Sequence, residues 1–169
     1  MNQKEFIAVI RPFKDKLYRI ARRLLVSDDE AQDATQEVLL KLWTNKEKLK
    51  NYKNVEAFAV TMTKNFCLDR LKSKQAANIA IKPIHNFRTA NDLEKQLIAR
   101  DSTRHIKNLI DELPEQARMI IQLRDVEQYD FKEIATMLDM KETAVRVALS
   151  RARKIIREQL IAKHNYGIN

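Results

Sequence analysis

The stretch that most constrains the fold is residues 130–157, DFKEIATMLDMKETAVRVALSRARKIIR, which has the pattern of two helices joined by a tight turn. Asp130 is a good N-cap, and Glu133 three residues later completes a capping box that predicts the start of the first helix. After a turn at 139–141, apolar residues recur at helical spacing from Val145 onward, so the second helix is expected to bury one side. Its opposite side must then face solvent or a partner.

That opposite side of the second helix is basic and polar. It carries Thr143, Arg146, Val147, Ser150, Arg151, Lys154 and Arg157. Residues 109–142 hold 4 Lys/Arg against 9 Asp/Glu, whereas residues 143–169 hold 6 against 1, so positive charge is concentrated at the second helix. Such a helix suits insertion into the major groove of DNA. The alternative is a solvated basic face on an ordinary helical hairpin.

Glycine and proline are scarce, since the chain has one Gly and three Pro in 169 residues. Hairpin turns and phosphate-binding loops depend on glycine, and 44% apolar with 33% charged residues is typical of helical bundles. We therefore predict an all-α fold. The helical pattern fails between residues 75 and 91, so two small helical domains, 1–74 and 92–169, are expected on either side of a flexible linker at 75–91.

Apolar periodicity divides the first domain into helices over 3–26, 28–43 and 55–74. Pro12 is expected either to kink the first of these or to break it into two helices, because proline cannot donate the helical hydrogen bond. Ser27 and Asn54 are expected to cap the other two, since their side chains can accept from unpaired backbone N–H groups.

In the second domain, a helix over 92–112 is followed by one from 115 to about 126. Pro114 is placed at the first position of the latter, where its missing N–H costs nothing. In the first domain, Arg19, Arg22 and Arg23 are interpreted as solvated surface groups, with contact to nucleic acid as the alternative.

The outer side of the 28–43 helix is acidic and ends in apolar groups. It carries Asp29, Asp33, Gln36, Glu37 and Leu40, with Trp43 near the end. Apolar groups set beside acids on an outward side are typical of a protein-docking surface with a charged rim. A solvated acidic face is the alternative, while a metal or acid–base site would lack a His or Cys companion.

Basic and aromatic groups gather where the second and third helices of the first domain are joined. Residues 45–54, NKEKLKNYKN, form a lysine-rich connection with Leu49 and Tyr52 interleaved. The polar end of the next helix adds Lys64, Asn65, Asp69, Arg70, Lys72 and Lys74. Basic groups, an amide and an aromatic loop are ingredients of a site for single-stranded nucleic acid, although an ordinary solvated helix end has a similar composition.

Several function classes are excluded by the residues. Cys67 is the only cysteine, so no internal disulfide is expected and the thiol is interpreted as a small buried hydrophobe. No run approaches the ~20 apolar residues of a membrane span, which predicts a cytoplasmic protein without membrane insertion. The histidines are isolated, and the sequence offers no nucleophile–base pair, metal-ligand set or cofactor loop, so neither enzyme activity nor a cofactor is expected.

Three motifs follow one another along nearly the whole chain. They are Asp33-Ala34-Thr35-Gln36-Glu37 with Lys41-Leu42-Trp43, then residues 58–71 (FAVTMTKNFCLDRL), then Leu113-Pro114-Glu115 with Leu123-Arg124, Glu133-Ile134-Ala135 and residues 145–153. In this order the chain resembles bacterial sigma factors of the sigma-70 family, in the extracytoplasmic-function (ECF) group. The resemblance implies region 2, a linker and region 4, and a factor that binds core RNA polymerase and directs promoter-specific transcription initiation.

The resemblance also implies a role for each group of residues. Docking on the β′ clamp helices of core RNA polymerase is implied for Asp33, Gln36, Glu37 and Leu40. Contact with the melted −10 strand of the promoter is implied for Leu49, Lys64, Asn65 and Arg70. Recognition of the duplex −35 element is implied for Thr143, Arg146, Val147, Ser150, Arg151 and Lys154. An anti-sigma factor is implied as a further partner.

The second helix of the 130–157 stretch departs from the family pattern at its start. It begins Lys141-Glu142-Thr143-Ala144-Val145, where the family commonly has Ser-x-Gly-Thr-Val, so the usual N-cap is missing. Val147 replaces a commonly polar residue and could touch a thymine methyl group instead. A dimeric helix-turn-helix repressor is the competing hypothesis, but it leaves the acidic side of the 28–43 helix without a use.

Overall fold

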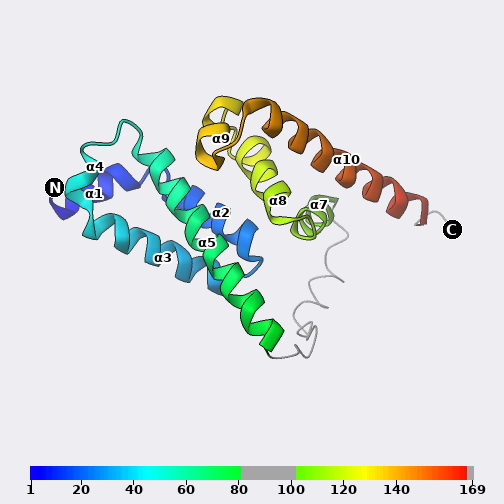
Figure 1. Cartoon of the computed structure of the whole chain (residues 1–169), viewed down its shortest axis with the longest axis horizontal. Helices are drawn as coiled ribbons and strands as arrows, with labels where there is room; N and C mark the ends of the chain where they lie inside the picture. The colour runs from blue at the N-terminus through cyan, green and yellow to red at the C-terminus, as the bar shows by residue number, and fades with distance from the viewer. Residues whose placement is uncertain (81–101, 167–169) are drawn as a thin grey trace.

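The computed structural model describes residues 1–80 and 102–166, and the regular structure in these two ranges is helical throughout (Figure 1). The predicted all-α fold is confirmed. In chain order the elements are α1 (Gln3–Ile10), α2 (Lys14–Leu25), α3 (Asp28–Thr44), α4 (Lys46–Leu49), α5 (Val55–Ala80), α7 (Ser102–Asp111), α8 (Glu115–Ile121), the π-helical turn η1 (Gln122–Val126), α9 (Phe131–Leu138) and α10 (Glu142–Tyr166).

The predicted helix caps are present. Ser27 Oγ accepts from the Glu30 N–H at 3.3 Å, and Asn54 Oδ1 accepts from the Ala57 N–H at 2.9 Å. Asp130 and Glu133 form the reciprocal bonds of a capping box at the start of α9. Each cap satisfies a backbone donor that the first helical turn leaves unpaired, a contribution of about 1 kcal/mol.

The predicted break at Pro12 is also present, since α1 ends at Ile10 and α2 begins at Lys14. The predicted turn between the last two helices is confirmed by Asp139, which ends α9 in the left-handed conformation at φ 52°. A short polar residue tolerates this conformation better than most, so the turn reverses the chain without glycine.

Several predicted boundaries are wrong. Helix α5 continues through Ala80, so the segment expected to begin the linker at residue 75 is helical, while the remainder from 81 lies outside the described residues. Pro114 is the N-cap of α8 rather than its first residue, and α8 ends at Ile121, where η1 replaces the expected α-helix. The predicted helix over 92–112 is described only from Ser102, where α7 begins.

The first domain is a bundle built around α2. Its side chains Leu17, Ile20 and Leu24 are fully buried among α3 and α5, which contribute Val38 and Cys67. Burial raises the pKa of the Cys67 thiol to about 12. The thiol therefore stays protonated, and the prediction of a small buried hydrophobe is confirmed.

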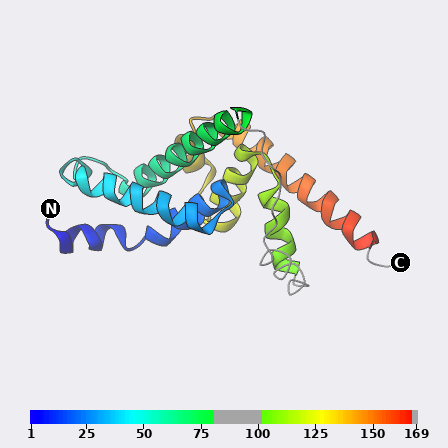
Figure 2. The ribbon, with the colours of Figure 1, turned by 90° about the horizontal axis from the view of Figure 1, so that it is seen from below.

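The second domain packs α10 across α8 and α9. Val145, Leu149 and Ala152 of α10 are buried, as the spacing predicts, against Ile120 of α8 and Ile134 of α9. Beyond this point α10 runs away from the N-terminal helices (Figures 1 and 2) and contacts α7, where Lys163 Nζ lies 3.4 Å from His105 Nδ1. The buried half thus anchors a long helix whose outer side is available.

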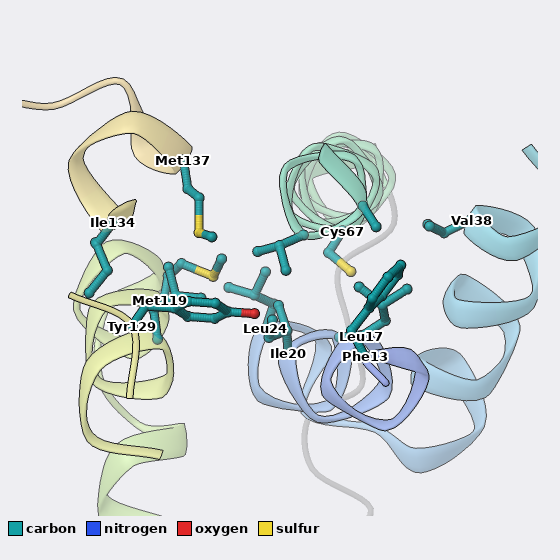
Figure 3. Close-up of a cluster of buried hydrophobic side chains, with 14 of the residues drawn as sticks. Phe13, Leu17, Ile20, Leu24, Val38, Cys67, Met119, Tyr129, Ile134 and Met137 are labelled. Atoms are coloured by element: carbon teal, nitrogen blue, oxygen red, sulfur yellow. The ribbon is translucent and has the colours of Figure 1, made fainter. Parts of the chain in front are cut away.

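The two domains share one continuous hydrophobic cluster. Figure 3 shows Ile20 and Leu24 of α2 facing Met119 and Tyr129 of the second domain. Helix α2 therefore belongs to both cores, with one side turned to α3 and α5 and another to α8 and η1.

Arginines of α2 complete this junction with polar contacts. Arg19 contacts the Glu127 carboxylate through two hydrogen bonds, Nε to Oε1 at 2.6 Å and Nη2 to Oε2 at 2.8 Å. Arg23 donates from Nε to Gln122 at 3.0 Å and from Nη1 to Asp111 at 3.0 Å. The expectation of a solvated group is wrong for Arg23, whose side chain is 12% exposed. Arg19 and Arg22 keep 45% and 36% of their side chains exposed, but both form ion pairs rather than facing solvent alone.

Further hydrogen bonds cross the same junction. Arg118 Nη2 donates to the carbonyl of Leu24 at 2.9 Å, at the end of α2. Glu56 of α5 accepts from the Tyr129 hydroxyl at 2.6 Å across the junction and, within the first domain, from Lys16 Nζ at 2.8 Å. Burial raises the pKa of Glu56, but these two hydrogen bonds outweigh it and hold that pKa below its ordinary value, so the carboxylate is charged.

We expect Arg19→Ala to lower the free energy of unfolding by about 1–3 kcal/mol, because the buried Glu127 carboxylate loses its charged partner. Urea unfolding of the full chain measures this, with the exposed Arg11→Ala as the matched control. The double variant Arg19→Ala with Glu127→Gln should lose less than the sum of the single variants. Additive losses, or equal losses for Arg19→Ala and Arg11→Ala, would contradict the interaction.

Candidate nucleic-acid interface

The acidic side of α3 is exposed where the sequence predicts it. Asp33, Gln36 and Glu37 are exposed, and Leu40 on the same side of the helix is 58% exposed. An apolar side chain of this size in water, next to carboxylates, is a suitable centre for a protein contact. Helix α3 keeps its other side buried, so this side is held rigidly.

Trp43 was predicted to lie at the end of the outward side of the 28–43 helix, but its ring packs within the chain. Its ring packs edge-on against Phe6, with centroids 5.1 Å apart, and the Lys46 ammonium lies 3.5 Å from its centroid. The indole is therefore partly covered within the chain. Leu40 supplies the exposed apolar group of the α3 side instead.

Asp33 is linked to α5 by an ion pair with Arg70, Oδ2 to Nη1 at 2.6 Å. This pair joins a residue predicted to bind polymerase to one predicted to bind the −10 strand. The Asp33 and Arg70 side chains are 54% and 34% exposed, respectively, so the pair contributes little to stability. A partner can replace it without a large loss.

The structure does not bring the predicted −10 residues together on one surface. Leu49 is 2% exposed and belongs to the hydrophobic cluster, because α4 turns its side chain inward. Lys64 is half-buried and donates to the Met137 carbonyl of α9 at 3.1 Å. Asn65 is exposed. The assignment of Leu49 to a DNA surface is thus replaced by a core position.

An aromatic stack lies near this region and was not singled out as a site. The rings of Tyr52 and Phe58 are stacked, with centroids 4.1 Å apart and an interplanar angle of 17°. Tyr52 is 42% exposed, so the outer ring is available to solvent. The tyrosine within the lysine-rich 45–54 segment was the sequence signal for it.

On α10, the residues predicted to contact the −35 element are all exposed. They are Thr143, Arg146, Val147, Ser150, Arg151 and Lys154. Val147 is 47% exposed, which is high for an apolar side chain in the middle of a basic surface. The structure therefore presents this set on one accessible side of a helix whose other side is anchored.

Arg146 of α10 and Arg124 of η1 share one aromatic partner, Phe131, which sequence analysis missed. The Arg146 guanidinium carbon lies 4.1 Å from the ring centroid of Phe131, and that of Arg124 lies 4.3 Å from the same centroid. Arg124 Nη1 also donates to the carbonyl of Tyr129 at 3.0 Å. A lone aromatic residue at a helix start gives no periodic signal, so only the folded chain brings the three residues together.

Other kinds of site receive no support in residues 1–80 and 102–166. The described part of the chain has no cluster of three or more His, Cys, Asp or Glu side chains that could hold a metal ion. None of the helices in these ranges is both long and apolar enough to cross a lipid bilayer.

Two family models match the chain in the order of its two domains. The sigma-70 region 2 model matches residues 9–77, and the sigma-70 region 4 model matches residues 104–156. The chain belongs to the sigma-70 family. Region 2 of this sigma factor therefore contains α2, α3 and most of α5, and region 4 contains the helix-turn-helix formed by α9 and α10.

Curated relatives place it in the ECF group. It is 28% identical over 162 residues to the ECF RNA polymerase sigma factor SigE of Mycolicibacterium smegmatis, with 93% of this chain and 62% of SigE covered. It is 22% identical over 169 residues to the ECF sigma factor SigW of Bacillus subtilis, with 94% of this chain and 90% of SigW covered. The chain thus spans less than two thirds of SigE but most of SigW. It is an ECF sigma factor, acting with RNA polymerase in promoter-specific transcription initiation.

Solved structures share the fold. The sigma factor RpoE of Bartonella quintana, solved with the anti-sigma factor NepR, has a TM-score of 0.76 at 18% identity, and the match covers 93% of this chain and 97% of RpoE. CnrH, solved with the cytosolic domain of CnrY, has a TM-score of 0.67 at 20% identity, covering 95% of this chain and 90% of CnrH. At these identities the likeness concerns the arrangement of helices.

We expect Leu49→Ala to lower the free energy of unfolding by about 2–5 kcal/mol, because it leaves a cavity in the core. The exposed Asn65→Ala should change it by less than about 0.5 kcal/mol. Urea unfolding of both variants separates a core residue from a surface residue. If Leu49→Ala lowered the free energy of unfolding as little as Asn65→Ala, the assignment of Leu49 to the core would be wrong.

Proposed function

We propose that this ECF sigma factor binds core RNA polymerase through α3 and promoter DNA through α5 and α10. The exposed set on α10, opposite the buried Val145 and Leu149, carries the proposal, because a helix anchored on one side can enter a groove with the other. The factor acts in the cytoplasm and breaks no covalent bond, since the polymerase supplies the chemistry. Each DNA contact alone is weak, and attachment to the same polymerase raises their effective concentration.

The polymerase contact consists of Asp33, Gln36, Glu37 and Leu40, docking on the β′ clamp helices. Leu40 supplies the apolar centre, and the carboxylates supply a charged rim that favours a basic partner. The weak surface pair between Asp33 and Arg70 is exchanged on docking for a contact with the polymerase.

The −10 contact is made by Asn65 and Lys64 of α5 with the exposed ring of Tyr52. Taking a base out of the DNA stack costs a few kcal/mol. Stacking of a base on an aromatic side chain contributes about 1–3 kcal/mol and can offset that cost. Lys64 donates all its protons to a phosphate only after its hydrogen bond to the Met137 carbonyl of α9 breaks, so binding of the −10 strand weakens one link between α5 and α9.

The −35 contact is made by the exposed side of α10 in the major groove. Arg146 is the candidate for a bidentate contact with guanine, and Val147 for contact with a thymine methyl group. Ser150, Arg151 and Lys154 extend the surface toward the phosphates. Control by an anti-sigma factor is part of the proposal, because RpoE of Bartonella quintana, which shares this fold, was solved in complex with the anti-sigma factor NepR.

We expect Asp33→Arg with Glu37→Arg to abolish binding to core RNA polymerase, because both exposed carboxylates would become cations at a surface built for a basic partner. The matched control is Asp15→Arg with Glu112→Arg, which changes the net charge equally at exposed positions away from α3. Both double variants should unfold cooperatively in urea. Equal polymerase affinity of the two would remove the α3 assignment.

We expect Arg146→Ala to cost about 1–3 kcal/mol at one base pair of the −35 element, because a bidentate contact discriminates by that amount. Holoenzyme binding is measured on promoters chosen from a random library, with each −35 base pair changed in turn. Arg157→Ala, further along the same helix, is the control for a general loss of charge. A uniform loss over all sequences would make Arg146 a phosphate contact.

A further inference from the structure

Phe131 holds two cations, the half-buried Arg124 and the exposed Arg146, beside the exposed basic side of α10. The guanidinium carbon of Arg146 on α10 lies 4.1 Å from the ring centroid, and that of Arg124 on η1 lies 4.3 Å from it. Within the described residues neither guanidinium forms an ion pair with a carboxylate. Two unneutralised positive charges held at one ring repel each other, so an anionic partner stabilises the arrangement.

The ring itself is fixed by the backbone that precedes it. Phe131 is the first residue of α9, directly after the N-cap Asp130. The Glu133 N–H donates to Asp130 Oδ1 at 2.7 Å, and the Asp130 N–H donates to Glu133 Oε2 at 3.0 Å. These reciprocal bonds lock the turn that carries Phe131, so the ring is a rigid surface for the guanidinium groups.

Arg124 is fixed independently of the ring. Its Nη1 donates to the carbonyl of Tyr129 at 3.0 Å, and Tyr129 N–H in turn donates to the carbonyl of Leu123 at 3.0 Å. Arg124 therefore approaches Phe131 from η1, while Arg146 approaches it from α10. A guanidinium that stacks over an aromatic ring can still donate from its N–H groups to a base edge or a phosphate. Arg146 keeps all of these donors, and Arg124 keeps those that do not bond to the Tyr129 carbonyl.

We propose that Phe131 is a positioning residue for −35 recognition, which presents the N–H edge of Arg146 to a base pair while Arg124 contacts an adjacent phosphate. This inference rests on the proposed role of α10. It extends the DNA surface beyond α10 to η1 and to the start of α9. It also explains why an aromatic residue occupies a half-buried position between two cations.

The experiment uses full-length variants bound to core polymerase, on a promoter selected from a random library by the wild-type holoenzyme. Discrimination is measured at the base pair whose preference Arg146→Ala removes. Phe131→Leu should reduce that discrimination by about 3- to 30-fold, because a cation–π contact of ordinary strength is lost. Phe131→Tyr keeps the ring and should restore most of the preference. The double variant Phe131→Leu with Arg146→Ala should lose little more discrimination at this base pair than Arg146→Ala alone.

Arg124→Ala tests the phosphate contact. It should weaken binding uniformly across sequences and reduce the slope of log affinity against log salt concentration by about one, because one fewer counterion is released. Thermal unfolding of each variant checks that region 4 stays folded.

Three results would overturn the inference: equal discrimination by Phe131→Leu and Phe131→Tyr, a Phe131→Leu loss spread over all base pairs, or additivity with Arg146→Ala. If the wild-type holoenzyme shows no dependence on any −35 base pair, the proposed role of α10 fails as well. That outcome is distinguishable, because it appears before any variant of Phe131 is compared.

Discussion

The contact between Arg19 of α2 and Glu127 is the constraint on which the arrangement of the two regions depends. The Glu127 side chain is 2% exposed, and a carboxylate at that depth requires charged or hydrogen-bonding partners. Arg19 supplies two hydrogen bonds and Gln122 a third, at 3.1 Å. Since Glu127 follows η1 directly, docking on α2 fixes the turn that leads to Tyr129 and to the start of α9. The geometry of the helix-turn-helix thus begins at a helix of region 2.

Sequence patterns predicted the parts of the fold that depend on neighbours along the chain. The caps at Ser27, Asn54 and Asp130 each involve a backbone N–H three residues away, so composition and spacing determine them. Helical periodicity also divided α10 into a buried and an exposed side, because both follow from the same repeat of 3.6 residues. For this reason the exposed set on α10 and the exposed acidic side of α3 could be predicted residue by residue.

The remaining features depend on residues far apart in the sequence. Arg19 and Glu127 are separated by 108 positions, and no local pattern pairs them, so the α2 arginines resembled solvated groups. Leu49 lies among lysines, which suggested an exposed loop, but the short helix α4 turns this one apolar side chain into the core. Phe131 is a single aromatic residue at a helix start, and its two arginine contacts come from different elements. Local propensity does not predict such contacts, since they form only when distant parts of the chain pack together.

The closed arrangement of the two regions engages a group that the proposed −10 contact needs. Lys64 Nζ donates to the Met137 carbonyl at the end of α9, so the cation next to Asn65 in the sequence is engaged by region 4 while the junction is intact. The junction is held by several hydrogen bonds that involve charged groups and by a shared hydrophobic cluster. Under the proposed function, a single −10 contact competes with all of these interactions at once, whereas a polymerase that binds both regions at separate places adds its own binding free energy to the opening of the junction. The proposed function therefore makes promoter recognition depend on prior assembly with the enzyme.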